Sequence, residues 1–355
     1  MNLIKEFVYS SNPMRVIFGR GSLARLPEEI ALLGLSKALI LCTPGQRAQA
    51  ELIGRSLDER LAGLFAEAVM HVPVETARKV CAAARRSGAD GVIAVGGGST
   101  TGLAKAIALE SGLPIVAIPT TYAGSEMTSI YGMTEGGLKR TGKDLRVLPR
   151  SVIYDPELTL NLPLGLAVTS GMNAIAHAVE GLYAKDSNPI MDLIAEEGIR
   201  AMASALPSLA KDLKNMEARS EALYGAWLCG TVLGSVGMAL HHKLCHTLGG
   251  SFSLPHAEVH TVVLPHAVAY NAPAIPDALH RMRRALLSAD PATALFELAS
   301  SHGAPTSLRA LGMLEADLDR AADIAVSNPY WNPRPIERAG IRALLQRAWE
   351  GSRPQ

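Results

Sequence analysis

The stretch GVIAVGGGSTTGLAKAIAL, residues 91–109, contains an apolar strand, a glycine turn and a helix in direct succession. Its first five residues form the short continuous apolar run typical of a parallel strand that is covered on both faces. The glycines allow the backbone to approach a phosphate closely, and the N-terminus of the following helix presents free N–H groups. The pattern is neither a Walker A motif nor the spaced Rossmann fingerprint. On its own it therefore also fits a tight turn without a ligand.

The same alternation of strand and helix continues on both sides of this stretch. We predict further strands at 38–41, 69–74 and 114–118, and helices at 51–64 and 75–86. This order predicts a doubly wound parallel sheet, which gathers ligands at the carboxyl ends of its strands. Beyond about residue 160 we expect helices alone, over 166–183, 189–213 and 218–248 and in shorter segments up to Trp349. We therefore expect an α/β domain over residues 1–160 and an all-α domain over residues 161–355.

Length and composition exclude several classes of protein. The chain has 355 residues, of which 48% are hydrophobic and 19% charged, so intrinsic disorder is excluded and about two domains are expected. The net charge of +1 argues against a nucleic-acid or membrane partner. No apolar run approaches the roughly 18 residues of a membrane span, and the charged N-terminus does not resemble a signal peptide. The four cysteines show no CxxC pairing. We expect a cytoplasmic protein.

A second loop supports a nucleotide site. The segment PTTYAGSE, residues 119–126, follows the strand predicted at 114–118. Because parallel strands end at the same edge of a sheet, its hydroxyl groups and Gly124 are expected beside the glycine turn. A polar loop that satisfies its own backbone is the alternative. Two such loops at neighbouring strand ends favour nucleotide binding.

Histidines are concentrated in one segment of the predicted helical domain. Six of the ten lie between residues 241 and 266, namely His241, His242, His246, His256, His260 and His266. His242 and His246 are four residues apart, on one face of a helix that Gly249-Gly250 is expected to end. Asn173 and His177 have the same spacing on an earlier helix, with Glu180 one turn further on. Such histidines can converge on a metal ion or on a proton-transfer site, and spacing alone does not distinguish the two.

These motifs resemble the iron-containing (group III) alcohol dehydrogenases. The resemblance spans most of the chain, and it rests on FGRGS at 18–22, the glycine turn with Ala104-Lys105, the loop at 119–126, YDPELT at 154–159, the helix at 171–180, and the stretch from His246-Thr-Leu-Gly-Gly to Pro255-His256. It implies a Rossmann-like dinucleotide-binding domain and an all-α domain, with the active site in the cleft between them.

Departures from the family pattern are informative. The family holds a divalent metal with one aspartate and three histidines, and the matching positions here are Asn173, His177, His242 and His256. A neutral amide attracts a dication less than a carboxylate does, so the resemblance implies a vestigial site and no required metal. Gly102 replaces an aspartate of the glycine loop. Thr43 stands where the family has a ribose-binding aspartate, so NADPH is expected to be accepted beside NADH.

In these departures the chain resembles the branch of the family that reduces maleylacetate. That resemblance implies reduction of the carbon–carbon double bond of maleylacetate to 3-oxoadipate, in the breakdown of aromatic compounds, by a homodimer. The implied catalytic residues are His246, His242, His177 and His256, with His246 or His242 as the proton donor. Asn173, Lys243 and Arg334 are candidates for binding the dicarboxylate substrate. The implied cofactor contacts are Thr43, Gly97, Gly98, Ser99, Thr120, Thr121, Ser125 and Lys139.

Three other functions stay open at this point. One is a metal-dependent alcohol or aldehyde reductase of the same family, which tight binding of zinc or iron would favour. Another is a sugar-phosphate or dehydroquinate-synthase-like cyclase, which shares the architecture and NAD but has more acidic and lysine residues around its metal. The third is a ligand-binding protein without catalytic activity, and binding of NADH would argue against it.

Overall fold

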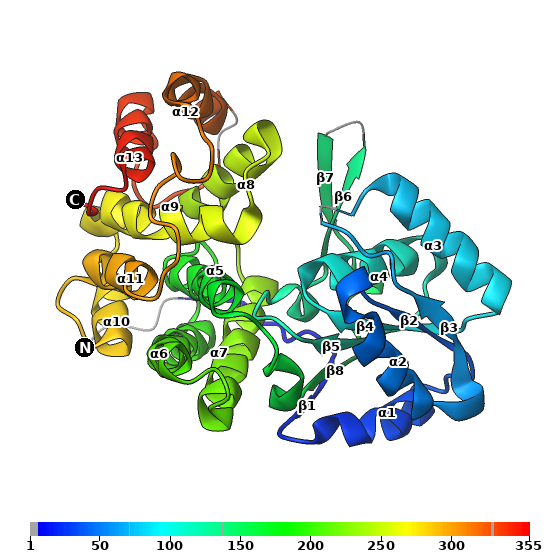
Figure 1. Cartoon of the computed structure of the whole chain (residues 1–355). Helices are drawn as coiled ribbons and strands as arrows, with labels where there is room; N and C mark the ends of the chain where they lie inside the picture. The colour runs from blue at the N-terminus through cyan, green and yellow to red at the C-terminus, as the bar shows by residue number, and fades with distance from the viewer. Residues whose placement is uncertain (1–5, 71, 136–137, 328–329) are drawn as a thin grey trace. The chain divides into compact units, whose positions relative to one another are not determined.

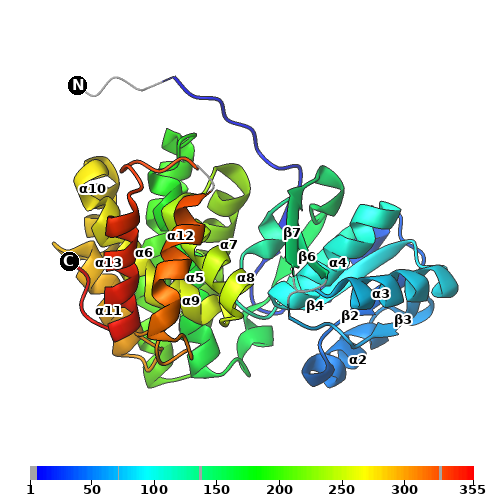
Figure 2. The same ribbon diagram turned by 90° about the horizontal axis from the view of Figure 1, so that it is seen from above.

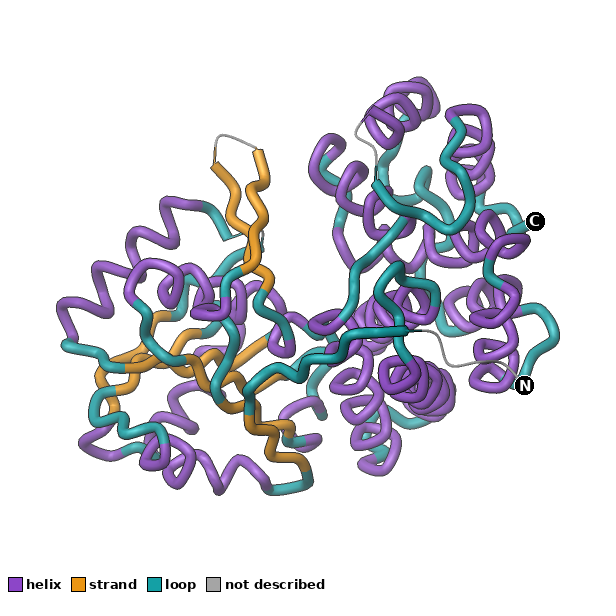
Figure 3. The backbone as a smooth tube through the Cα atoms, turned by 180° about the vertical axis from the view of Figure 1, so that it is seen from behind, coloured by secondary structure: helices purple, strands orange, loops and turns teal. Residues whose placement is uncertain are grey.

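The computed structural model describes residues 6–70, 72–135, 138–327 and 330–355, without the side chains of residues 138 and 139. The chain forms two compact units. One is Asn12–Leu162, and the other is Pro163–Gln355 together with the described residues before Asn12. Every strand among the described residues belongs to the first unit (Figure 3).

The first unit is built on a six-stranded sheet in the order β1-β8-β5-β4-β2-β3. Every pairing in it is parallel. The strands are β1 Arg15–Phe18, β2 Ala38–Leu41, β3 Leu61–Phe65, β4 Gly91–Gly96, β5 Ile115–Pro119 and β8 Ser151–Tyr154. An antiparallel hairpin of β6, Ile130–Glu135, and β7, Leu138–Lys143, follows the loop after β5.

Helices cover both faces of the sheet, which explains its uninterrupted apolar strands (Figure 1). Helices α1, Leu26–Leu32, and α2, Arg47–Arg55, pack with Ala38 and Ile40 of β2, while α3, Val74–Ser87, and α4, Gly98–Ser111, pack with Leu39 and Leu41. Successive strand residues point to opposite faces, so each residue of β2 is buried. The predicted doubly wound sheet is confirmed.

Two predicted elements of this unit are wrong. The helix expected at 51–64 ends at Arg55, and residues 61–65 form strand β3. Leu57, Leu61 and Leu64 are spaced by four and three residues, which imitates a helical face across a turn. The strand expected at 69–74 is also absent from the described residues, since Val74 already begins α3. Residue 71 lies outside the described part.

The second unit is helical. Its helices are α5 Leu164–Leu182, α6 Pro189–Lys211, α7 Met216–Ser235, α8 Leu240–Phe252, α9 His256–Asn271, α10 Pro276–Leu286, α11 Pro291–Ser300, α12 Leu318–Ser327 and α13 Arg338–Glu350. Helices α6, α7 and α9 pack against α5, which is buried at every residue from Ala167 to Leu182 (Figure 2). A residue on α5 is therefore held by packing on all sides.

The helix predicted at 218–248 is two helices. Helix α7 ends at Ser235 and α8 begins at Leu240, with a bend of 95° between them. Helix α8 also passes through Gly249-Gly250 to Phe252, where Ser253 takes the left-handed conformation that ends it. Among the described residues no single helix is long and apolar enough to cross a membrane; by length and composition alone, the bent pair α7–α8 meets that test.

Candidate active site

The glycine turn and the loop after β5 are in contact. Gly96 has φ +151°, which glycine tolerates, and a Cβ at Gly97 would lie 2.7 Å from Thr121 Oγ1. Gly97 caps α4, whose first turn carries no acidic residue. The buried Thr100 Oγ1 makes no hydrogen bond within the described residues. This backbone turn at a helix N-terminus fits the pyrophosphate of a dinucleotide.

Gln46 connects two of the predicted cofactor contacts. Its amide nitrogen donates to Thr120 Oγ1 at 2.7 Å, and its amide oxygen accepts from Thr43 Oγ1 at 3.0 Å. Thr43 follows β2 and Thr120 follows β5, with β4 between these strands in the sheet. Sequence reasoning missed Gln46, because a glutamine near a helix start carries no signal of its own.

Lys105 is a buried cation on α4, and it was also missed as a functional residue. Its Nζ donates to the carbonyls of Ser125, Thr128 and Ile130 at 2.7, 2.8 and 2.7 Å. Burial lowers the pKa of Lys105 to about 7, and the nearby Glu126 carboxylate opposes that shift. Lys105 holds the segment after β5 against the helix that follows the glycine turn.

Other predicted residues of this unit lie around the same loops. Gly98 and Ser99 begin α4, and Ser125 begins the short turn after β5. A side chain at Gly102 would meet Val72 Cγ2 at 2.8 Å, so the place of the family aspartate is filled by a neighbouring apolar group. Lys139 belongs to β7, and its side chain lies outside the described part.

In the second unit the structure brings histidines from three helices together. The histidine cluster consists of His177 on α5, His241, His242 and His246 on α8, and His256 and His260 on α9. Its ring centroids lie 5.2 Å apart for His177 and His242, 5.0 Å for His242 and His260, and 4.4 Å for His256 and His260. His246 is 6.2 Å from His242 and is exposed, whereas His177 and His242 are buried.

A buried carboxylate holds one side of this cluster. Glu180 is fully buried on α5, and its Oε2 lies 2.6 Å from His242 Nδ1, within hydrogen-bond distance. The same carboxylate accepts the backbone N–H groups of Ala239, His241 and His242 at 2.9, 2.8 and 3.2 Å. It therefore satisfies the free N–H groups at the start of α8 and also explains the break after α7.

Several buried atoms of the site make no hydrogen bond within the described residues. They are Asn173 Oδ1, His177 Nδ1, His242 Nε2 and His260 Nε2. Burial, reinforced by the neighbouring imidazoles, holds the pKa of His177 and of His260 well below the usual range. Neutral imidazoles and an amide oxygen are donors that a divalent cation accepts, so Asn173, His177, His242 and His256 fit such an ion in donor type. No carboxylate belongs to that set of four.

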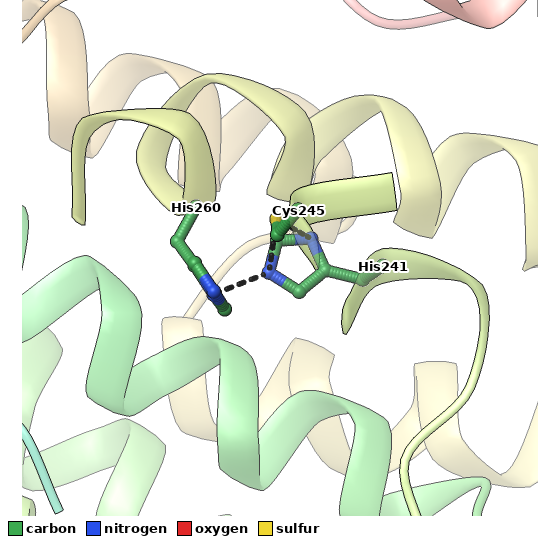
Figure 4. A group of neighbouring side chains, drawn as sticks. All are labelled: His241, Cys245 and His260. Atoms are coloured by element: carbon green, nitrogen blue, oxygen red, sulfur yellow. Dashed lines mark hydrogen bonds between the residues drawn. The ribbon is translucent and has the colours of Figure 1, made fainter. Parts of the chain in front are cut away.

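A second group of donor atoms lies deeper in the unit (Figure 4). His241 Nε2 is 2.9 Å from His260 Nδ1 and 3.6 Å from Cys245 Sγ, and all three residues are buried. Burial, together with the charge of Glu180, raises the pKa of the Cys245 thiol well above its usual value. The trio has the donor types of a zinc site, and its members also satisfy one another by hydrogen bonds.

The predicted substrate contacts differ in what they touch. Lys243 Nζ lies 5.5 Å from the ring centroid of Tyr330. Arg334 donates to the carbonyl of Tyr270 at 2.6 Å and stacks over the Tyr270 ring, so the structure engages its guanidinium in packing the second unit. Tyr330, which sequence reasoning missed, has a buried hydroxyl without a hydrogen-bond partner among the described residues. Burial raises the pKa of Tyr330, so the phenol keeps its proton.

Residues 13–156 match the family described as "Iron-containing alcohol dehydrogenase", and residues 167–349 match "Fe-containing alcohol dehydrogenase family, C-terminal". The chain belongs to the iron-containing alcohol dehydrogenase family. This confirms the resemblance found in the sequence and the fold class that it implied. The family is NAD(P)-dependent, in keeping with the glycine turn at α4.

Relatives within the iron-containing alcohol dehydrogenase family cover the whole chain. A maleylacetate reductase of Burkholderia cepacia is 58% identical over 351 residues, which are 99% of this chain and 100% of the relative. The crystal structure of maleylacetate reductase from Rhizobium sp. strain MTP-10005 is 54% identical, with a TM-score of 0.95 over 99% of this chain and 100% of that chain. An iron-containing alcohol dehydrogenase from Corynebacterium glutamicum is 42% identical, with a TM-score of 0.93 over 97% of each chain.

Proposed function

We propose that this protein reduces the carbon–carbon double bond of maleylacetate with NADH or NADPH and releases 3-oxoadipate. The observation that carries the proposal is the 58% identity to a maleylacetate reductase over the full length of both chains. The geometry supports it, because one unit offers a dinucleotide turn and the other a cluster of hydrogen-bonding histidines. Turnover then requires both units.

The first unit holds the cofactor in this proposal. Its backbone turn at Gly97, Gly98 and Ser99 binds the pyrophosphate, and Thr120, Thr121, Ser125 and Lys139 are the further contacts. Thr43 is uncharged and hydrogen-bonded to Gln46, so no carboxylate at this position repels the 2′-phosphate of NADPH. The nicotinamide supplies a hydride to the substrate.

The second unit handles the charge and the proton. Hydride adds to the alkene carbon remote from the ketone, and the electron pair of the double bond moves toward the ketone oxygen. Neutral His177 and its neighbours can donate hydrogen bonds to that developing enolate. A proton then joins the carbon beside the ketone. We assign this proton to His246, which is exposed on α8 and can regain it from water, with the buried phenol of Tyr330 as the competing donor.

The substrate also carries two carboxylates. Lys243 is on α8 together with His242 and His246, and its ammonium lies near the Tyr330 ring. We therefore assign Lys243 to one of the two substrate carboxylates. Arg334 is a weaker assignment, because its guanidinium already binds the Tyr270 carbonyl. Asn173 is placed on α5 one turn before His177 and offers its amide to the substrate oxygen.

A divalent cation would be held by Asn173, His177, His242 and His256, and it would act as a Lewis acid toward the ketone oxygen. We propose that reduction of the conjugated alkene does not depend on it, since the ketone already activates the double bond and the four residues lack a carboxylate. The alternative function, a metal-dependent alcohol or aldehyde reductase, is favoured by Asn173 Oδ1, His177 Nδ1 and His242 Nε2, which make no hydrogen bond in the part of the chain that the structure describes.

The deciding experiment is NADH oxidation with maleylacetate after exhaustive dialysis against a chelator, with metal content measured by mass spectrometry. Rapid turnover by the metal-free protein supports both parts of the proposal. Activity that returns only with zinc, iron or manganese refutes metal independence. No reaction with maleylacetate under either condition, together with reduction of simple aldehydes, establishes the alternative.

The remaining parts of the proposal concern where and in what state the enzyme works. We propose that the enzyme is cytoplasmic, in keeping with the free, buried state of Cys42, Cys81, Cys229 and Cys245, and that it is a homodimer, as the family resemblance implies. Light scattering coupled to gel filtration measures the oligomeric state directly, and a mass equal to one chain would refute the dimer.

A further inference from the structure

We propose that Glu180 is a positioning residue that fixes the tautomer of His242, with the proton on Nδ1 and the lone pair on Nε2. This inference rests on the proposed function, in which His242 belongs to the catalytic cluster. It goes beyond that function by excluding His242, one of the proton-donor candidates on helix α8.

The hydrogen-bond pattern around the carboxylate carries the argument. An ionised carboxylate only accepts, and Oε2 of Glu180 lies 2.6 Å from His242 Nδ1, so the proton between them sits on the imidazole nitrogen. Three backbone N–H groups at the start of α8 point at the same carboxylate. They use the carboxylate as an acceptor and leave it no freedom to turn away from the ring.

The packing of α5 fixes the carboxylate in turn. Glu180 is fully buried, and the helix that carries it is buried along its length. Because Glu180 and His177 share this helix, one rigid element sets both the position of His177 and the orientation of His242. The ring centroids of the two histidines are 5.2 Å apart.

The consequence concerns the opposite edge of the His242 ring. Its Nε2 is buried and makes no hydrogen bond within the described residues. With the Nδ1 proton held by Glu180, the ring of His242 presents its Nε2 lone pair at this edge. It can therefore accept a hydrogen bond or ligate a cation, but it has no proton at Nε2 to give. Of the donors considered above, this leaves His246 and Tyr330.

The first test uses the wild-type protein labelled with ¹⁵N-histidine and dialysed against a chelator. Long-range proton–nitrogen correlation spectra distinguish protonated from bare ring nitrogens, and the His242 signals are identified by their loss in His242→Asn. We expect a protonated Nδ1 and a bare Nε2. The reverse pattern would overturn the proposal, whether or not the protein reduces maleylacetate.

The second test is Glu180→Gln. Glutamine has one side-chain oxygen where glutamate has two, so it can accept hydrogen bonds at only one of the two positions. It also replaces the charge-assisted bond to His242 with a weaker neutral one. We expect part of the His242 proton to move to Nε2 and kcat to fall about 10–100-fold, with the KM for NADH unchanged. A folded variant with the wild-type His242 spectrum and an unchanged kcat would overturn the proposal. If the variant does not fold, the wild-type spectrum decides alone.

Tyr183→Phe is the matched control. The Tyr183 hydroxyl donates to Glu180 Oε1 at 3.4 Å, on the other side of the carboxylate from His242. Its removal perturbs Glu180 without touching the bond to Nδ1. We expect the His242 spectrum and kcat to stay at their wild-type values, and a change of tautomer in this control would count against the proposed pairing.

Discussion

The ammonium of Lys105 donates a hydrogen bond to the backbone carbonyl of Ser125 at 2.7 Å. Lys105 lies on α4, the helix after the glycine turn, and Ser125 lies in the loop after β5, the neighbouring strand. Further bonds to the carbonyls of Thr128 and Ile130 make this a buried charge with oxygen atoms around it. One side chain thus sets the spacing of the two loops that we propose to bind the cofactor.

Lys105→Met is expected to lower both stability and cofactor affinity. The variant keeps the volume of the side chain but leaves buried carbonyl groups without donors, which costs about 2–4 kcal/mol of unfolding free energy. The loops after β4 and β5 lose their link, so the KM for NADH should rise more than kcat falls. Urea unfolding and steady-state kinetics measure the two effects.

Lys79→Met is the control for that variant, because Lys79 is an exposed lysine on α3. Its unfolding free energy should stay within about 0.5 kcal/mol of wild type. If Lys105→Met were equally harmless, the link between the loops would not contribute to stability.

The stability advantage of the wild type over Lys105→Met is expected to grow with pH. Burial lowers the pKa of Lys105 to about 7 in the folded protein, against 10.5 for an exposed lysine. Between these values the unfolded chain binds one proton more than the folded chain, so the unfolding free energy of the wild type rises by up to about 1.4 kcal/mol per pH unit. Below the folded pKa both states bind the proton and the advantage is constant.

Urea unfolding of both proteins at several pH values across that window measures the effect, since other titrating groups cancel in the difference. An advantage that stays flat or declines above neutral pH would show that Lys105 keeps its proton in the folded protein.

His246→Ala is expected to reduce kcat about 100-fold while leaving the affinity for NADH unchanged, because the variant removes the proposed proton donor and nothing near the glycine turn. Steady-state assays and titration of NADH fluorescence measure the two quantities. Tyr330→Phe tests the competing donor in the same assays. His280→Ala, at an exposed position on α10, serves as the control and should retain full activity. If His246→Ala kept the wild-type kcat and Tyr330→Phe lost it, the proton donor would be the phenol of Tyr330.

Thr43→Asp is expected to separate the two cofactors. A carboxylate at this position repels the 2′-phosphate of NADPH and can bind the ribose hydroxyls of NADH, so the preference for NADH should increase about tenfold or more. Ratios of kcat/KM for NADH and NADPH measure the preference. Thr43→Val controls for loss of the bond to Gln46, and an equal shift in that variant would assign the effect to the lost bond.

The sequence predicted β2, β4 and β5, which are continuous apolar runs, and missed β1, β3, the hairpin β6–β7 and also β8, although β8 is buried at every residue. Residues 38–41 and 91–95 are continuous apolar runs, which only the interior of a parallel sheet accommodates in so short a length. The edge strand Leu61–Phe65 contains a glycine and follows α2 after a short turn, so its leucines continued the helical spacing. Local periodicity does not reveal where a chain turns.

The site was predictable where spacing along one helix brings residues together. Asn173 and His177 share one face of α5, and His242 and His246 share one face of α8, because each pair is four residues apart. The role of Glu180 was not predictable, since its partners lie about sixty residues further along the chain. Lys105 and Gln46 were missed for the same reason, as their hydrogen bonds join separate strand ends. Contacts between distant segments are set by the fold and leave no local pattern.

The burial of α5 restricts how this enzyme can change during evolution. At Asn173, which is enclosed by the packing of the helix, a larger or smaller side chain would disturb the core. Aspartate has nearly the same size as asparagine, and the codons of the two differ by one base in the first position. A single nucleotide change therefore restores the carboxylate of the wider family without repacking the helix. A neutral and an anionic site are therefore one nucleotide apart at this position.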